Sequence, residues 1–190
     1  MEMHNFEKFF VNSDFCSFFH RTLIFPSFFR FINKNLAGKA LEIGCGIGKT
    51  TKLLAEKYSK LMITSIDYDR GQIERARKNN NLGNVKFQQG DATKLKFKNL
   101  SFDYVIETNT FHHINDYSKA IKEVYRVLKK NGIFYMMDIS KYVFFWPLNV
   151  FFPPESRFTK EDFIENLENN GFNIEKSNGR LLFYINARKV

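Results

Sequence analysis

The sequence predicts an α/β protein whose seven-stranded sheet is mostly parallel, with an antiparallel hairpin at its C-terminal end and helices on both faces. Three observations lead to this prediction. From about residue 36 short β-rich runs alternate with helical patterns, a glycine-rich loop joins the first strand to the next helix, and the last two β-rich runs flank a turn sequence. A chain of 190 residues, 44% hydrophobic and 26% charged, is long enough for one such core.

The alternating part contains five predicted strands and three predicted helices. The strands cover residues 39–43, 61–66, 85–88, 102–106 and 133–139. The helices cover residues 49–58, 71–80 and 117–130, where apolar residues recur at helical spacing. Asp116 is placed to cap the third helix, and the pair Asn131-Gly132 is expected to close it.

The C-terminal part predicts one more helix and then the hairpin. Thr159, followed three residues later by Asp162, resembles a capping box and opens a helix over residues 160–170. Gly171 is the expected left-handed residue after that helix. The hairpin strands are predicted at 172–176 and 181–187, with the turn at 177–180.

Net charge and cysteine content limit the binding partners and the cellular compartment that we expect for the protein. The net charge of +9 favours anionic partners in general, or serves only as a solvated basic surface. No known nucleic-acid-binding motif accompanies the charge, and the basic residues are scattered along the chain. There is no run of 18 apolar residues and no secretory signal, and the two cysteines, Cys16 and Cys45, are expected to be reduced. We therefore expect a cytoplasmic protein.

The strongest chemical signal is the loop after the first strand, which has glycines at positions 44, 46 and 48. A dinucleotide site requires G-x-G-x-x-G, but Lys49 stands where the third glycine would belong, and no phosphate-binding P-loop motif is present. Glu42 ends the strand beside this loop. Its carboxylate would repel a pyrophosphate and suit a cationic ligand, or it could serve to fix the loop.

With this loop the sequence resembles the class I S-adenosylmethionine-dependent methyltransferases, in particular the small-molecule branch that includes quinone-type enzymes. Further motifs of the family follow in order: an acid after the second strand, Gly90-Asp91 after the third, and a stretch at 123–132 similar to E-x-x-R-V-L-K-P-G-G. The resemblance covers residues 37–190 and implies a Rossmann-like fold with S-adenosylmethionine as cofactor. The cofactor-binding residues that it implies are Glu42, Gly44, Cys45, Gly46, Gly48, Asp67, Tyr68, Asp91, Ala92 and Glu107.

Two acids carry the most specific implied roles. In the family the acid corresponding to Asp67 holds the ribose hydroxyls, and the acid corresponding to Asp91 holds the adenine amino group. One carboxylate can accept from both hydroxyls of a ribose diol, and Asp67 lies 23 residues after Gly44, where the ribose acid of such folds is found. The alternative is that both acids only shape their loops.

Candidate catalytic residues follow the fourth strand, whose carboxyl end lies beside the methyl group to be transferred. They are Glu107, His112 and His113. Adjacent histidines cannot face the same way on a helix, so we expect at most one of them in the pocket, and a structural role is the alternative for each. No metal is expected, because the four histidines show no i,i+4 pairing.

The acceptor is expected to be a small molecule, apolar or aromatic, methylated on oxygen, nitrogen or carbon. Motifs for amino methylation of adenine or glutamine and for cytosine C5 methylation are missing. Residues 1–36, with ten phenylalanines between positions 6 and 36, are predicted to form an aromatic helical extension before the domain at 37–190. We expect segments 15–31 and 142–152 to line or cover the acceptor site; the alternatives are that they fill the core or contact a membrane surface.

Two other functions stay open. A nicotinamide-dependent oxidoreductase is opposed by the glycine spacing. A non-catalytic module that binds cofactor or nucleic acid on the same fold is not excluded by any motif. The oligomeric state cannot be predicted.

Overall fold

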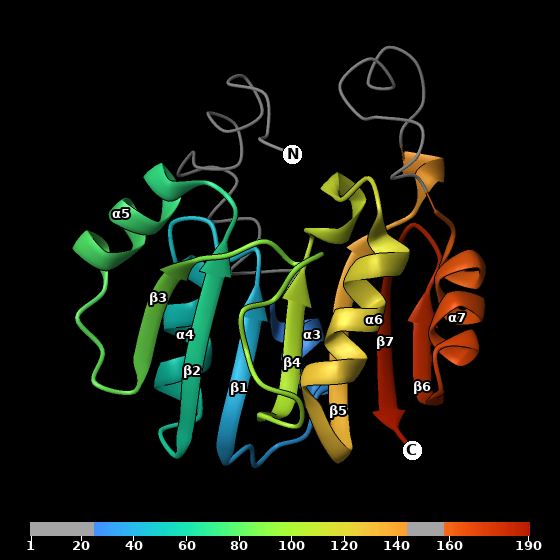
Figure 1. Ribbon diagram of the computed structural model, residues 1–190, viewed down its shortest axis with the longest axis horizontal. Coiled ribbons are helices and arrows are strands. Elements are labelled where there is room, and N and C mark those ends of the chain that lie inside the picture. The colour runs from blue at the N-terminus through green and yellow to red at the C-terminus, as the bar shows by residue number, and fades with distance from the viewer. Residues whose placement is uncertain (1–24, 144–157) are drawn as a thin grey trace.

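Seven strands form one sheet in the computed structural model, which describes residues 25–143 and 158–190 (Figure 1). Their order is β3-β2-β1-β4-β5-β7-β6. The bounds are β1 (Gly38–Ile43), β2 (Leu61–Asp67), β3 (Val85–Gln89), β4 (Phe102–Thr108), β5 (Leu128–Ile139), β6 (Phe172–Gly179) and β7 (Leu182–Lys189). Strands β1 to β5 pair in parallel, whereas β7 is antiparallel to both β5 and β6. The predicted fold class is confirmed.

Helices cover both faces of this sheet (Figure 1). They are α3 (Phe25–Phe31), α4 (Lys49–Lys57), α5 (Arg70–Asn79), α6 (Tyr117–Val127) and α7 (Lys160–Asn169), with short 3-10 turns η2 (Phe111–His113) and η3 (Lys141–Val143). Buried residues of α6 and α7 pack on the face that presents Leu41, Val105 and Phe134. Buried residues of α3 and α4 pack on the opposite face, which presents Ala40 and Tyr135. Alternate residues of each strand thus feed two cores.

Helix α6 is shorter than predicted, ending at Val127 instead of residue 130. Leu128 already pairs with Phe102 of β4, so β5 begins where the helix was expected to continue. The Lys189 ammonium also donates to the carbonyl oxygens of Tyr125 and Leu128, at 2.6 and 2.9 Å, and satisfies the helix end from β7. The predicted closing pair Asn131-Gly132 lies inside β5 instead.

The C-terminal hairpin also differs in its bounds. Its strands extend to Gly179 and start again at Leu182, so the turn is shorter than the predicted 177–180 and lies later in the chain. Gly179 adopts a positive φ of 81° and pairs with Phe183, which moves the reversal past it. The capping box at Thr159 is confirmed, and Gly171 has the predicted left-handed φ of 89°.

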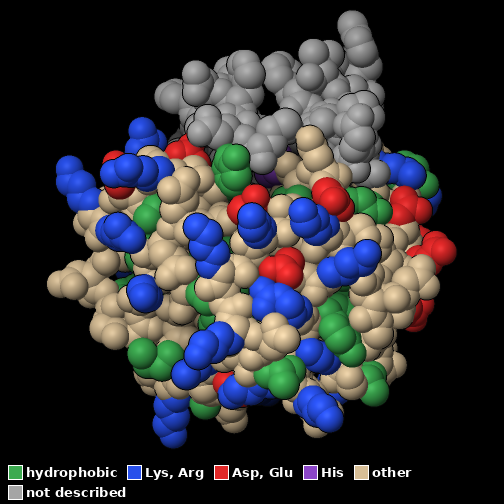
Figure 2. Space-filling model, viewed as in Figure 1, with side chains coloured by type: hydrophobic (Ala, Val, Ile, Leu, Met, Phe, Trp, Pro, Cys, Tyr) green, Lys and Arg blue, Asp and Glu red, His purple; other side chains and the backbone are tan. Residues whose placement is uncertain are grey.

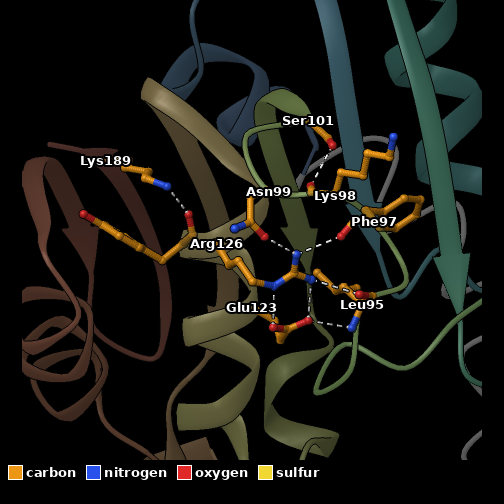
Figure 3. A network of polar contacts seen from close by, with 9 residues as sticks. Leu95, Phe97, Lys98, Asn99, Ser101, Glu123, Arg126 and Lys189 are labelled. Atoms are coloured by element: carbon orange, nitrogen blue, oxygen red, sulfur yellow. Dashed lines mark hydrogen bonds and ion pairs between the residues drawn. The ribbon is translucent and has the colours of Figure 1, made fainter.

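Arg126 and Glu123 of α6 clamp the connection between β3 and β4 (Figure 3). The guanidinium donates to the carbonyl oxygens of Leu95 and Phe97, at 2.9 and 2.8 Å, and to the Asn99 side chain at 2.8 Å. The Glu123 carboxylate accepts from Arg126 and from the Leu95 amide. The E-x-x-R part of the resembling stretch therefore fixes a loop, which the sequence alone did not reveal.

The described part of the N-terminal aromatic segment fills core. Phe25, Phe28 and Phe31 of α3 are buried, and the hydroxyls of Ser27 and Tyr184 lie 2.6 Å apart. These three phenylalanines therefore fill the core, which was the alternative to covering the acceptor site. Residues 15–24 and 144–152 of the two predicted covering segments lie outside the described residues. Among the helices that the structure describes, none is long and apolar enough to cross a membrane.

Candidate functional site

The predicted site residues come together at the carboxyl ends of β1, β2, β3 and β4 (Figure 1). The Gly44 and Cys45 amides donate to the Ile66 carbonyl at the end of β2, at 2.8 and 3.0 Å. The Gly90 amide donates to the Asp67 carbonyl, which joins the loops after β2 and β3. Parallel strands bring these distant loops to one sheet edge, where ligands of such sheets bind.

The glycine loop needs glycine for two reasons. All three glycines have positive φ, at 74°, 52° and 81° for Gly44, Gly46 and Gly48. A Cβ on Gly44 would lie 1.9 Å from Thr110 Oγ1, and one on Gly48 would lie 2.6 Å from Asn80 Nδ2. A Cβ on Gly46 would meet none of the described residues within 4 Å. Within the described part of the chain, the middle of the loop therefore presents bare backbone, as a closely bound ligand requires.

Three predicted cofactor residues offer the site backbone or an exposed ring. Cys45 packs its side chain among Ile73, Ala76 and Phe87, and burial raises the pKa of its thiol well above the ordinary value. The side chain of Ala92 is buried in the core below α6. Tyr68 follows β2 and is half exposed. A ligand at this edge could contact the backbone of the first two and the ring of Tyr68.

Glu42 is buried beneath the glycine loop. One carboxyl oxygen, Oε2, accepts from the hydroxyls of Thr51 at 2.5 Å and Ser65 at 2.6 Å, while Oε1 has no hydrogen-bond partner in the described part of the chain. Burial raises the pKa of Glu42 to about 7, against the lowering effect of the two hydroxyls. Glu42 thus joins β1 to β2 and α4, and one of its oxygens is left without a partner among the described residues.

Asp67 and Asp91 stand on neighbouring loops. Asp67 Oδ2 accepts from the Gly46 amide at 2.8 Å, and Oδ1 accepts from the Asp69 amide at 2.9 Å. Asp67 is thereby fixed against the middle of the glycine loop. Asp91 Oδ1 accepts from both the amide and the hydroxyl of Thr93, at 2.8 Å each, in the manner of an Asx turn.

A second group of polar side chains is buried between the ends of β4 and β5. His112 Nδ1 bonds to Asp138 Oδ1, and the ring centroids of His112 and His113 are 4.0 Å apart. Glu107 Oε1 accepts from the Thr110 amide at 2.5 Å, and its Oε2 has no partner within residues 25–143 and 158–190. Burial, and then the charge of Asp138, raises the pKa of Glu107 well above its ordinary value. Burial lowers the pKa of His113 to about 2.

Sequence reasoning missed Asp138. Its signal was present, because it is a carboxylate at the end of the otherwise apolar run of β5. The sequence also gave no reason to single out Asn109 and Ser140. Both have a buried side-chain oxygen without a partner among the residues that the structure describes.

The unsatisfied oxygens make a pattern. Within the described ranges, buried side-chain atoms without a partner in or shortly after the carboxyl ends of these strands include Glu42 Oε1, Gln72 Oε1, Glu107 Oε2, Asn109 Oδ1 and Ser140 Oγ. Buried polar atoms nearly always have a partner, so such atoms indicate a place where a ligand or water binds. Together with the open glycine backbone and Asp67, they suit a ligand with hydroxyl and ammonium donors, as S-adenosylmethionine has.

Metal binding and surface charge add little to this site. No group of three or more histidine, cysteine or acidic residues that could hold a metal occurs within 25–143 and 158–190. Lysine and arginine side chains are spread over the face shown in Figure 2, with no single dense cluster.

Comparison with known proteins gives concordant results. The profile of a family described as "Methyltransferase domain" matches residues 41–136. A demethylmenaquinone methyltransferase from Staphylococcus epidermidis is 34% identical over 112 residues, which are 58% of this chain and 46% of that protein. A malonyl-[acyl-carrier protein] O-methyltransferase from Priestia megaterium is 37% identical over 102 residues, covering 54% and 36% of the two chains. The match thus spans less than half the length of either relative.

A solved structure shares this fold. The crystal structure of an S-adenosylmethionine-dependent methyltransferase from Aquifex aeolicus superposes with a TM-score of 0.82, covering 100% of both chains at 18% identity.

Proposed function

The chain belongs to the methyltransferase-domain family, and from this premise we propose that it transfers a methyl group from S-adenosylmethionine to a small molecule. One observation carries the proposal: Asp67 is hydrogen-bonded to the Gly46 amide at the point where no described side chain covers the glycine backbone. The carboxylate that we propose for ribose binding thus lies beside the glycine backbone. The rival dinucleotide site would need its third glycine at Lys49.

Each residue of the cradle has a proposed part. Asp67 accepts from the ribose hydroxyls, Asp91 binds near the adenine amino group, and the backbone from Gly44 to Gly48 lies against the methionine moiety. Glu42 holds the loop from below, and its unsatisfied oxygen favours a cationic group there. Bound S-adenosylmethionine supplies a sulfonium methyl group, and the chain's own task is to orient the acceptor in line with it and exclude water.

We propose an apolar or aromatic acceptor. The relative named demethylmenaquinone methyltransferase supports it, since that name describes an apolar quinone. The relative named for malonyl-[acyl-carrier protein] supports a second candidate, an acyl group carried by a protein. The two differ in chemistry, because a malonyl carboxylate is ionised at neutral pH and a quinol hydroxyl is not.

Calorimetric titration with S-adenosylhomocysteine tests cofactor binding. A charged hydrogen bond contributes about 1.5–3 kcal/mol, so Asp67→Ala should weaken binding by roughly tenfold to over a hundredfold. The matched control is Asp103→Ala, which removes a carboxylate bonded to Lys39 and Lys129 at the opposite end of the strands. Equal affinity of Asp67→Ala and wild type would rule out this placement.

Turnover separates the enzyme from a non-catalytic module. Wild-type protein is incubated with S-adenosylmethionine and either demethylmenaquinol or malonyl-[acyl-carrier protein], and formation of S-adenosylhomocysteine is measured. Tight cofactor binding without turnover of either acceptor would favour the module. Binding of NADH in place of S-adenosylhomocysteine would favour the oxidoreductase.

A further inference from the structure

The buried pair Asp138–His112 has the geometry of a catalytic base with its orienting carboxylate. Asp138 accepts three hydrogen bonds: Oδ1 from the His112 ring and from the Ile139 amide at 2.7 Å, and Oδ2 from the His112 amide at 3.2 Å. Three donors on one carboxylate prevent it from rotating. The ring of His112 is fixed in turn, because its own backbone amide is bonded to the same carboxylate.

The hydrogen bond also selects a tautomer. The Asp138 carboxylate accepts, so His112 Nδ1 carries the proton and the lone pair of the neutral ring lies on Nε2. An imidazole with its Nδ1–H held by a buried carboxylate and its lone pair on Nε2 is the form that removes a proton from a substrate.

Two further titratable groups lie beside Asp138 and His112. Burial, and then the charge of Asp138, raises the pKa of Glu107 on β4 well above its ordinary value. His113 on η2 is neutral, since burial lowers its pKa to about 2. The Asp138 carboxylate on β5 accepts from three N–H groups and lies against the His112 ring, where a carboxylate stabilises an imidazolium.

We infer that His112 is the base that deprotonates the methyl acceptor, with Asp138 as its positioning residue, and that the acceptor carries a weakly acidic hydroxyl such as that of a phenol or quinol. This inference rests on the proposed function. A carboxylate acceptor is already ionised and would need no base, so the cluster favours the quinol over the malonyl candidate.

The step balances as follows. The acceptor hydroxyl gives its proton to His112 Nε2, and the resulting anion attacks the sulfonium methyl carbon. The methyl–sulfur bond breaks, its electron pair stays on sulfur, and S-adenosylhomocysteine leaves neutral at sulfur. If a ring carbon is the nucleophile, the proton on that carbon leaves to water as aromaticity is restored. His112 then returns its proton to solvent.

The pH dependence of His112→Gln tests this role with demethylmenaquinol as the acceptor. A positioned base contributes about 10²–10⁴-fold, so the variant should lose about that factor in kcat at pH 7, with little change in KM. Without the base only the ionised acceptor reacts, so the variant's kcat should rise roughly tenfold per pH unit toward the phenol pKa of about 10. A purely structural role would give a loss that does not change with pH.

Two further measurements test the His112 tautomer and the role of Asp138 independently. Two-bond ¹H–¹⁵N spectra of wild-type protein, which has four histidines, should show His112 protonated at Nδ1, and an Nε2–H tautomer would overturn the inference. Asp138→Asn should reduce kcat while S-adenosylhomocysteine binds with wild-type affinity, whereas Asp103→Asn should leave kcat unchanged. If Asp138→Asn does not fold, His112→Gln decides alone.

The outcomes separate the two proposals. Wild-type protein that fails to bind S-adenosylhomocysteine refutes the proposed function. Wild-type protein that binds it and methylates malonyl-[acyl-carrier protein] but not demethylmenaquinol refutes only the base and its substrate class. A pH-independent loss in His112→Gln does the same.

Discussion

Replacement of Glu42 by glutamine should remove a pH-dependent loss of stability. The pKa of Glu42 is raised from 4.5 to about 7 in the folded protein, with burial as the main cause. The folded state therefore binds the proton more tightly than the unfolded chain does. Its contribution is fully present below pH 4.5 and is lost progressively as pH rises through about 7.

The magnitude follows from the two pKa values. Between about pH 5 and about pH 8, a group shifted from 4.5 to about 7 lowers the free energy of unfolding by about 2.5 kcal/mol. Glu42→Gln cannot ionise, so its stability relative to wild type should improve by about that amount over the same interval. Because the comparison is a difference between two pH values, the cost of repacking an amide against Thr51 and Ser65 cancels.

Urea unfolding of both proteins at the two pH values provides the measurement. Glu56→Gln is the matched control, because Glu56 is exposed on the same α4 helix that Glu42 contacts through Thr51. That control should change with pH as wild type does. If wild type and Glu42→Gln lose equal stability between the two pH values, Glu42 is solvated in the native protein and the reasoning is wrong.

Three other predictions concern the loop, the clamp and metals. Gly44→Ala should unfold at a clearly lower urea concentration than Gly83→Ala and lose S-adenosylhomocysteine binding, because the new Cβ would lie 1.9 Å from Thr110 Oγ1, whereas a Cβ on Gly83 would meet no described residue within 4 Å. Equal urea midpoints of the two variants would contradict the close approach at Gly44. Arg126→Gln should lower the free energy of unfolding by about 1–2 kcal/mol, a modest amount because the clamp in Figure 3 is partly exposed, and should speed hydrogen exchange of the Leu95 amide. Lys122→Gln on the same helix should change neither quantity. Activity should survive a chelator, because neither the histidine spacing nor a cluster in the described residues offers metal ligands; loss restored by magnesium or zinc would refute this.

The order of elements and the place where the glycine loop meets the two acids could be predicted because their signals are local. Alternation of β-rich and helical patterns, glycines at 44, 46 and 48, and a carboxylate after each of two strands are all visible along the chain. Parallel pairing then brings the strand ends to one edge without further information. Asp67, Asp91 and the glycine loop therefore lie together as expected.

Element ends were less predictable, because partners distant in sequence set them. The helical pattern that starts at Tyr117 continues to residue 130, yet the helix ends at Val127. Lys189, 61 residues after Leu128 in the sequence, donates a hydrogen bond to the Leu128 carbonyl oxygen at that helix end. The spacing of aromatic residues in α3 predicts a helix. Only the packing of that helix against Tyr184 of the last strand shows that its phenylalanines belong to the core. Periodicity shows which face is apolar and does not show what covers it.

The sequence by itself determined the α/β alternation, the methyltransferase resemblance and the candidates Glu42, Asp67, Asp91, Glu107, His112 and His113. Only the tertiary structure decided what their environments do. Glu42 and Glu107 are buried carboxyls with raised pKa values, and Asp138, 26 residues from His112, fixes that ring. Ionisation and tautomer depend on burial and on neighbours within a few ångströms, and those neighbours come from other strands. A linear pattern names the acid or the base, and the fold sets its charge.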